Sequence, residues 1–380
     1  MSATARPAAG PVGSTSIGTA SPRPRAGFVD WLRLVASVQM IQGHAIDALL
    51  ADAHRSGAAF DAWTWARGLT APAFLVASGL SFHLATRLDD EARYASFRAT
   101  PGARRRRVVR AGWLIVLGTL LHALDGPWIV DVLQCVGATL LLLDACVSLS
   151  PRRSGVLAAC ACLGALAVAL ALPLASLEGE GAMRFVVSWV SRREGSLFPL
   201  TPWAAYVLFG ALLGRLCLPH GADTPPARTV GALAGCAAVA LVASPLLEAW
   251  IGAPDAETYA AHPSVVATRF GAVCALAAPL VALASRVALP AWGRTLAGET
   301  LALYVVHLLV LYAEGIGPGR VFAHAWSLPA SVAAAIVLAV VSALAALGWA
   351  RRWPPFEARW MPWLRGSRVA RSSTAGRGAE

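Results

Sequence analysis

Long apolar stretches, separated by short polar segments, dominate this sequence. Each of the ten stretches has roughly the 17–25 residues that an α-helix needs to cross about 30 Å of hydrocarbon. They lie near residues 27–50, 63–85, 108–125, 128–149, 155–175, 200–219, 229–250, 267–288, 298–316 and 328–350. Because backbone polar groups inside a bilayer must be paired within the chain, we expect an all-α, polytopic transmembrane bundle of about ten helices.

The composition excludes a water-soluble fold. Hydrophobic residues make up 57% of the chain and charged residues only 14%, whereas soluble domains carry about 25% charged residues. The net charge of +11 would suit a nucleic-acid binder, but the basic residues lie between the apolar stretches and not together on one surface. The expected partner is therefore the lipid bilayer and not nucleic acid. The seven cysteines lie in or beside apolar stretches without zinc spacing, so no metal is expected.

The arginines indicate an orientation in the membrane. If the N-terminus is cytoplasmic, 24 of the 32 arginines fall in cytoplasmic segments and six in external ones, as the positive-inside rule requires. We therefore predict that both termini are cytoplasmic. A membrane domain at 26–350 would lie between a disordered extension at 1–25 and a basic tail at 351–380. Within that tail, residues 351–364 mix Arg with Trp and Phe, which is typical of a segment at the headgroup boundary.

The first span carries the richest set of polar side chains. They recur every three or four residues and so form one stripe along a helix face: Asp30, Arg33, Ser37, Met40, His44 and Asp47. Ionisable side chains inside a bilayer are costly and mark functional positions, so this face should point into the bundle. Asp30 and Arg33 would lie near the cytoplasmic end, as an architectural ion pair or as a lining of the donor site, and His44 in the outer half.

Four other spans place polar or aromatic side chains at a similar outer depth, and these are the candidate substrate-binding residues. They are Arg67, Asp131, Gln134, Trp203, Tyr304 and His307. Simpler roles exist for some of them. Arg67 would equally neutralise a neighbouring carboxylate, Trp203 would equally belong to the interfacial aromatic belt, and His307 would equally pack on Tyr304. His54, in the external loop after the first span, would ordinarily be a solvated surface residue.

Several of these segments resemble bacterial membrane proteins related to heparan-alpha-glucosaminide N-acetyltransferase. The segments are FVDWLR at 28–33 with Met40 and His44, WAR at 65–67, APAFL at 71–75, SG at 78–79, VDVLQCVG at 130–137, FPLTPW at 198–203 with Gly210, and LALYVVH at 301–307. The resemblance spans roughly residues 26–316. Two positions depart from the family pattern, since the usual Arg-Gly is Arg33-Leu34 here and the Asp that often precedes the first-helix His is Gly43.

The resemblance implies a membrane acyltransferase of the bacterial inner membrane. Such an enzyme takes an acetyl group from cytoplasmic acetyl-CoA, or another acyl group from its acyl-CoA, and delivers it to an external glycan or amino-sugar acceptor. In the lysosomal enzyme the catalytic His lies in the luminal loop after the first helix. His54 therefore competes with His44 for the catalytic role.

Acyl transfer from a thioester needs a base for the acceptor and a group that stabilises the oxyanion. We predict His44 as general base or transient acyl acceptor, assisted by Asp47 or Asp131, with Arg67, Gln134 and Trp203 shaping the pocket. Arg33 and the cluster Arg104 to Arg107 would attract the phosphates of CoA. A simple topological anchor explains that cluster as well.

The alternative from another class is a solute or proton-coupled transporter with a polar site in the outer half of the membrane. Charged and imidazole side chains inside a bundle serve such transporters too. Against it, the sequence shows no internal repeat between the halves and no matching pair of Gly/Pro-interrupted spans.

Overall fold

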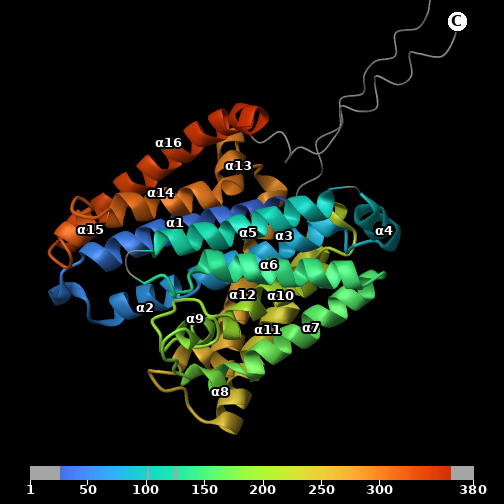
Figure 1. Cartoon of the computed structure of the whole chain (residues 1–380), viewed down its shortest axis with the longest axis horizontal. Coiled ribbons are helices and arrows are strands. Elements are labelled where there is room, and N and C mark those ends of the chain that lie inside the picture. The colour runs from blue at the N-terminus through green and yellow to red at the C-terminus, as the bar shows by residue number, and fades with distance from the viewer. Residues whose placement is uncertain (1–25, 101, 124–125, 361–380) are drawn as a thin grey trace, which may run out of the picture.

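All ten predicted spans coincide with helices. The computed structural model describes residues 26–100, 102–123 and 126–360, the side chains of residues 103 and 353–360 excepted (Figure 1). The helices at the predicted spans are α1 (Gly27–Leu49), α2 (Ala58–Arg67) with α3 (Thr70–Thr86), α5 (Ala103–Leu121), α6 (Val132–Leu149), α7 (Arg153–Ala169) with α8 (Ala171–Ala175), α10 (Leu200–Cys217), α11 (Pro226–Ile251), α12 (Pro263–Arg286), α14 (Thr300–Tyr312) and α16 (Leu328–Trp360). The expected all-α class is confirmed.

Short elements connect these helices. They are the α-helices α4 (Glu91–Ala99), α9 (Met183–Val187), α13 (Ala291–Gly298) and α15 (Pro318–Val321) and the 3-10 turns η1 (Asp52–His54), η2 (Gly221–Asp223) and η3 (Tyr259–Ala261). Between the ends of α1 and α16, Leu50 and Trp326 form an isolated parallel bridge. The predicted N-terminal extension lies outside the described residues. Of the predicted interfacial segment 351–364, the part up to Trp360 continues α16 as helix, and the rest lies outside the described residues.

Six helical stretches of the described chain are long and apolar enough to cross a membrane on their own: Ala58–Thr86, Val132–Leu149, Leu200–Cys217, Pro226–Ile251, Pro263–Arg286 and Leu328–Arg352. The pair α13 and α14 makes up to seven, although it is bent by 75° at its break. Three helices at predicted spans are not among these. α1 carries the polar stripe, α5 has four consecutive arginines in its first turns, and α7 is only 17 residues long. The ten-span count stays a prediction.

One interrupted helix was not anticipated from the sequence. α13 ends at Gly298, and after Glu299 the chain turns sharply into α14. The apolar stretch near 298–316 begins at the break itself. The hydropathy of that stretch therefore gave no sign of a bend. The described residues contain one such bent pair, whereas inverted-repeat transporters carry corresponding interrupted helices in both halves.

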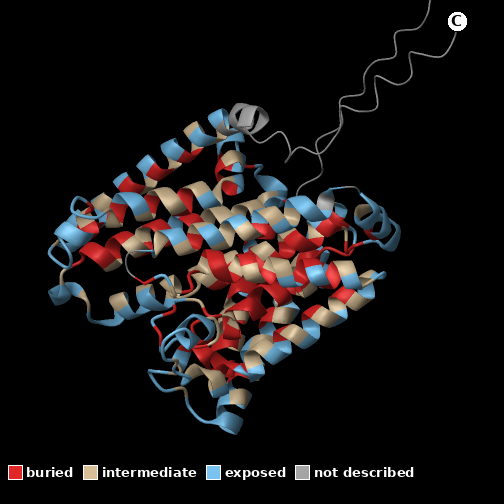
Figure 2. Cartoon of the chain, in the orientation of Figure 1, coloured by how far each residue is buried: buried red, intermediate tan, exposed pale blue. Residues whose placement is uncertain are grey.

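α1 is the helix around which the candidate site is built. It packs against α3, α12, α14 and α16, whereas α10 packs against α3, α6 and α7. Buried residues concentrate on the central helices, and α11 and α16 are largely exposed (Figure 2). The most apolar part of α10 is 72% buried within the protein and that of α11 only 11%. In a bilayer the apolar surface of α11 would contact lipid.

α3 and α10 approach so closely that only glycine fits at their crossing. A Cβ atom on Gly79 would lie 2.0 Å from the carbonyl oxygen of Val207, and one on Gly210 would lie 2.4 Å from the carbonyl oxygen of Val76. Small residues allow this backbone contact between membrane helices. Both glycines belong to the segments that carry the family resemblance, so the structure gives these positions a packing role.

We expect Gly79→Ala to destabilise the protein by about 1–3 kcal/mol, the usual range for overpacking, because the new methyl group meets backbone atoms that cannot rotate away. The measurement is the apparent melting temperature of the purified protein in detergent. Gly231→Ala on α11 is the matched control, since a Cβ there meets nothing within 4 Å. Equal melting temperatures for the two variants would contradict the packing role.

Candidate functional site

α1 and α14 bring two imidazole rings into contact. His44 Nδ1 lies 2.8 Å from His307 Nε2, and the two rings stack with centroids 5.0 Å apart. His307 is fully buried. The sequence placed both histidines in the outer half of the bundle on separate spans, and the structure joins them by a direct hydrogen bond.

The backbone of α14 determines which nitrogen of each ring carries a proton. His307 Nδ1 lies 2.9 Å from the carbonyl oxygen of Leu303, and a carbonyl oxygen only accepts hydrogen bonds, so Nδ1 is the protonated nitrogen. With both rings neutral, His307 Nε2 is then an acceptor and His44 Nδ1 donates to it. The remaining nitrogen, His44 Nε2, keeps its lone pair. No described residue forms a hydrogen bond with it.

Asp131 and Tyr304 adjoin the histidine pair. The Tyr304 hydroxyl donates to Asp131 Oδ2 at 2.5 Å, and the Tyr304 ring packs edge-on against His307 with centroids 5.6 Å apart. Asp131 is 1% exposed, and His122 Nε2 lies 3.6 Å from its Oδ2 atom. The carboxylate therefore holds Tyr304, which in turn supports His307.

Gln134 serves to position Asp131. The two residues form a capping box at the start of α6, in which Gln134 Oε1 accepts from the Asp131 backbone N–H at 2.6 Å. Gln134 Nε2 donates to Thr119 Oγ1 and to the carbonyl oxygen of Ile129. Because both hydrogen bonds from the Gln134 amide go to groups within the protein, Gln134 positions Asp131. A direct contact of Gln134 with a substrate stays a prediction.

Asp47 and Arg67 form an ion pair near the C-terminal end of α1. Arg67 Nη1 donates to Asp47 Oδ2 at 2.6 Å, and the two side chains are 33% and 38% exposed. Trp63 stacks on the Arg67 guanidinium with 5.5 Å to the ring centroid and donates from its Nε1 atom to Gln42. Arg67 is thus both the neutralising partner that the sequence suggested and a half-exposed cation beside His44.

The Arg67 side chain also lies against Gly43, one of the two positions that depart from the family pattern. A Cβ atom on Gly43 would lie 3.1 Å from Cγ of Arg67. The Arg67 side chain therefore lies over the helix surface that an Asp at this position would occupy.

Arg55 is a further charged residue beside Asp47 and was not among the residues predicted from the sequence. Its guanidinium contacts the carbonyl oxygen of Asp47, lies 3.7 Å from Asp47 Oδ1, and lies 3.5 Å from His324 Nε2. Hydropathy assigned Arg55 only to an external loop, and no spacing in the sequence relates that loop to the loop before α16.

The other predicted site residues lie apart from the histidine pair. Trp203 is buried against Phe198 and Tyr206 on α10 and stacks with Arg269 of α12. Arg33 donates to Ser81 Oγ of α3 at 2.6 Å, one turn beyond Asp30 near the start of α1. His54 ends η1 as an exposed residue.

Two of the four arginines in the cluster Arg104 to Arg107 pair with a buried carboxylate. Arg107 Nη2 lies 2.5 Å from Asp144 Oδ1 and Arg104 Nε lies 3.3 Å from Asp144 Oδ2. Asp144 was overlooked in the sequence, although a carboxylate inside an apolar stretch requires a cation and the neighbouring stretch begins with four of them. The Asp144 side chain is 4% exposed, so these two arginines neutralise a buried charge.

We expect Arg107→Gln to destabilise the protein by about 2 kcal/mol, because a buried carboxylate then loses the closer of its two cations. Chemical or thermal unfolding in detergent measures this loss. Arg106→Gln is the control, since Arg106 is exposed and has no carboxylate partner among the described residues. If both variants unfold alike, the Asp144 pairing contributes nothing to stability.

Within the described ranges, no group of three or more His, Cys, Asp or Glu side chains is placed to hold a metal ion. The chemistry available at the site is that of an unprotonated imidazole nitrogen, a half-exposed guanidinium and buried hydrogen-bonding partners. These groups are suited to accepting a proton and stabilising negative charge on oxygen.

Comparison with known proteins identifies the family of the chain. The family described as "Heparan-alpha-glucosaminide N-acetyltransferase, catalytic" matches residues 25–246. No curated protein matches the chain. The matched region includes His44, Arg67 and Asp131, whereas Tyr304 and His307 follow it. Together with the apolar helices, the match indicates a multi-pass membrane protein with transferase activity. The chain belongs to the heparan-alpha-glucosaminide N-acetyltransferase family.

Proposed function

We propose that the protein transfers an acetyl group from cytoplasmic acetyl-CoA to the amino group of an external sugar, with His44 Nε2 as the general base. The observation that carries this proposal is the hydrogen bond from His44 Nδ1 to His307 Nε2. It leaves the opposite nitrogen of His44 with a lone pair. A neutral imidazole is the usual base at physiological pH.

The reaction follows from these groups. His44 Nε2 removes a proton from the acceptor amine as its nitrogen attacks the thioester carbonyl carbon. The carbonyl oxygen becomes an oxyanion, and the Arg67 guanidinium nitrogens that do not bind Asp47 stabilise it. Collapse of the tetrahedral intermediate breaks the carbon–sulfur bond. The leaving thiolate takes the proton from the His44 imidazolium, so the products are the acetamide and free CoA.

His307 and Asp131 would act as positioning residues. His307 accepts from His44 Nδ1 and shares the positive charge that develops on His44 during proton transfer. Asp131 orients Tyr304, whose ring supports His307. Buried partners of this kind fix the orientation and tautomer of a functional imidazole, as the corresponding carboxylates do around metal-bound histidines.

The path of the donor follows from the orientation predicted by the arginines. With both termini in the cytoplasm, Arg33 lies near the cytoplasmic end of α1 and His44 lies eleven residues further out, about 16 Å at 1.5 Å per residue. The proposal therefore requires the acyl arm of the donor to enter the bundle beside α1 while its phosphates stay near Arg33. We propose that the protein lies in the bacterial inner membrane, with the acceptor on the external side.

The test uses the purified full-length protein in lipid nanodiscs with acetyl-CoA and glucosamine. Release of free CoA thiol should depend on the acceptor, and N-acetylglucosamine, whose amine is already blocked, should not support it. Absence of acceptor-dependent CoA release across amino sugars would contradict the enzyme. Uptake of the sugar into proteoliposomes without CoA release would support the transporter instead.

The same experiment separates two roles of His44. If His44 is a transient acyl acceptor, one equivalent of CoA is released before any acceptor is added, which is the kinetic signature of a covalent intermediate. If His44 is a general base, CoA release begins only with the acceptor.

A further inference from the structure

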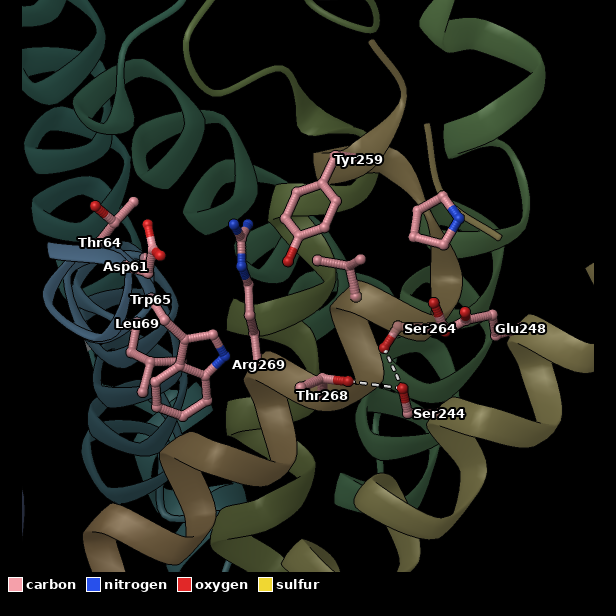
Figure 3. Close-up of a pocket in the computed structure, with 13 residues that line it drawn as sticks. Asp61, Thr64, Trp65, Leu69, Ser244, Glu248, Tyr259, Ser264, Thr268 and Arg269 are labelled. Carbon is pink, nitrogen blue, oxygen red and sulfur yellow. Dashed lines mark hydrogen bonds between the residues drawn. The ribbon is translucent and has the colours of Figure 1, made fainter. Parts of the chain in front are cut away.

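A cavity with both polar and apolar lining lies beside α2 (Figure 3). Neither His44 nor His307 lines it. Its volume is about 460 Å³, and side chains from α2, η3, α11 and α12 line it. The lining includes Asp61, Trp65, Glu248, Tyr259, Thr268 and Arg269. The proposed reaction uses none of these residues.

Arg269 is the cation of this cavity. In Figure 3 its guanidinium extends from α12 into the space between α2 and Tyr259. It lies 5.5 Å from the centroid of the Tyr259 ring and 5.9 Å from that of Trp203. Trp203 is 6% exposed. The two rings hold the guanidinium in place through cation–π contacts. Arg269 also interacts with the buried Tyr206 hydroxyl, and this contact engages part of its five N–H groups.

The positive charge of Arg269 has no ionic partner within the described part of the protein. No carboxylate of the described residues lies within 4.0 Å of it. A second arginine, Arg192, is near enough that burial and the charge of Arg269 together lower the pKa of Arg192. Arg192 has no carboxylate partner among the described residues either. Two neighbouring unneutralised arginines repel each other. Of the two, only Arg269 lines the cavity, and an anion bound to Arg269 would relieve part of that repulsion.

We propose that this cavity binds a carboxylate attached to a polyhydroxylated body, such as a sugar acid, with Arg269 as the primary ligand of the carboxylate. A guanidinium edge matches the two oxygens of a carboxylate in a bidentate pair. Trp65 is 54% exposed at the edge of the cavity and offers a flat apolar face to a sugar ring.

The rest of the lining favours hydroxyl groups over further negative charge. Asp61 and Glu248 are exposed carboxylates on opposite sides of the cavity (Figure 3). They accept hydrogen bonds from hydroxyls and repel a second anionic group. Thr268 adds a hydroxyl, hydrogen-bonded to Ser244 at 2.6 Å. A ligand with one carboxylate and several hydroxyls fits this lining better than a polyanion.

α2 separates the cavity from the histidine site. Trp65 of α2 and Gly68 just after it line the cavity, whereas Trp63 and Arg67 contact α1 residues. The binding proposal is therefore independent of the proposed acyl transfer, and it is tested by binding alone.

The experiment is isothermal titration calorimetry of the full-length protein in detergent with D-glucuronate, with uncharged D-glucuronamide as the matched ligand. Because the amide lacks the charge that Arg269 binds, we expect it to bind about tenfold more weakly or worse. Arg269→Gln should weaken glucuronate binding by about tenfold or more, since it removes the bidentate partner. Arg320→Gln, which removes an external arginine outside the cavity, should bind like the wild type.

Three results would overturn the proposal. One is equal affinity of the wild type for glucuronate and glucuronamide, a comparison that needs no variant and so does not depend on how Arg269→Gln folds. Another is unchanged glucuronate affinity in an Arg269→Gln protein whose melting temperature matches the wild type. The third is Arg269-dependent binding of phosphatidylglycerol in nanodiscs without any binding of glucuronate, which would identify a lipid headgroup as the ligand.

Discussion

His44→Ala is expected to lower acceptor-dependent CoA release by about 10²–10⁴-fold, the usual contribution of a general base. The substitution removes the nitrogen that keeps its lone pair while its neighbour His307 is fully engaged with Leu303 and His44. Water entering the vacated space would be a poor base. The Michaelis constant for acetyl-CoA should change little, because the proposed binding site for the donor phosphates is near Arg33, at the other end of α1.

His54→Ala provides the decisive control. His54 is the other histidine that the family resemblance suggests, and it lies exposed at the end of η1. We expect this variant to retain wild-type turnover. Loss of activity in His54→Ala together with normal activity in His44→Ala would assign the base to the loop histidine and would contradict a catalytic role for the histidine pair.

The sequence predicted which face of a helix carries functional side chains better than it predicted which helices are neighbours. A three- or four-residue spacing on α1 identified the stripe that contains His44 and Asp47, and both contact partners in the bundle. Helical periodicity fixes which side of a helix is polar. It does not say which other helix lies against that side, so the contact between His44 and His307 could only come from the structure.

Trp203 also shows that the sequence does not reveal which helices are neighbours. Its predicted depth was similar to that of His44, yet it packs with Phe198 and with Arg269, which lines a different cavity. Hydropathy predicts the depth of a residue along the membrane normal, but it does not predict the position of its helix in the membrane plane. Two residues at equal depth on different helices therefore need not share a site.

The pairing of buried charges was also not predicted from the sequence. Asp144 lies within an apolar stretch, and its partners Arg104 and Arg107 were assigned to topology and to the phosphates of CoA. A count of arginines by side gives an orientation without regard to pairing. The structure shows that at least part of the positive charge at this end of the bundle compensates a carboxylate inside it.

His307 positions His44 through the hydrogen bond between the two rings, so its loss should also lower activity strongly. We expect His307→Leu to lower kcat by about 10–100-fold, the range found when a buried partner that orients a functional imidazole is lost. Without an acceptor next to Nδ1, His44 is free to rotate and to protonate on the nitrogen that should act as base. The steady-state rate of CoA release measures kcat, and KM for acetyl-CoA should stay near its wild-type value.

His307→Gln separates this positioning role from simple packing. The amide oxygen of Gln reaches nearly the position of His307 Nε2 and accepts a hydrogen bond from His44 Nδ1, as the imidazole does. This variant should therefore recover much of the activity that His307→Leu loses, while both variants unfold at similar temperatures. If Gln and Leu give the same kcat, His307 serves only to fill space. His44 would then need another group to direct its lone pair toward the acceptor, and among the described contacts of its ring the remaining neighbour is Tyr312, whose ring centroid lies 6.5 Å away.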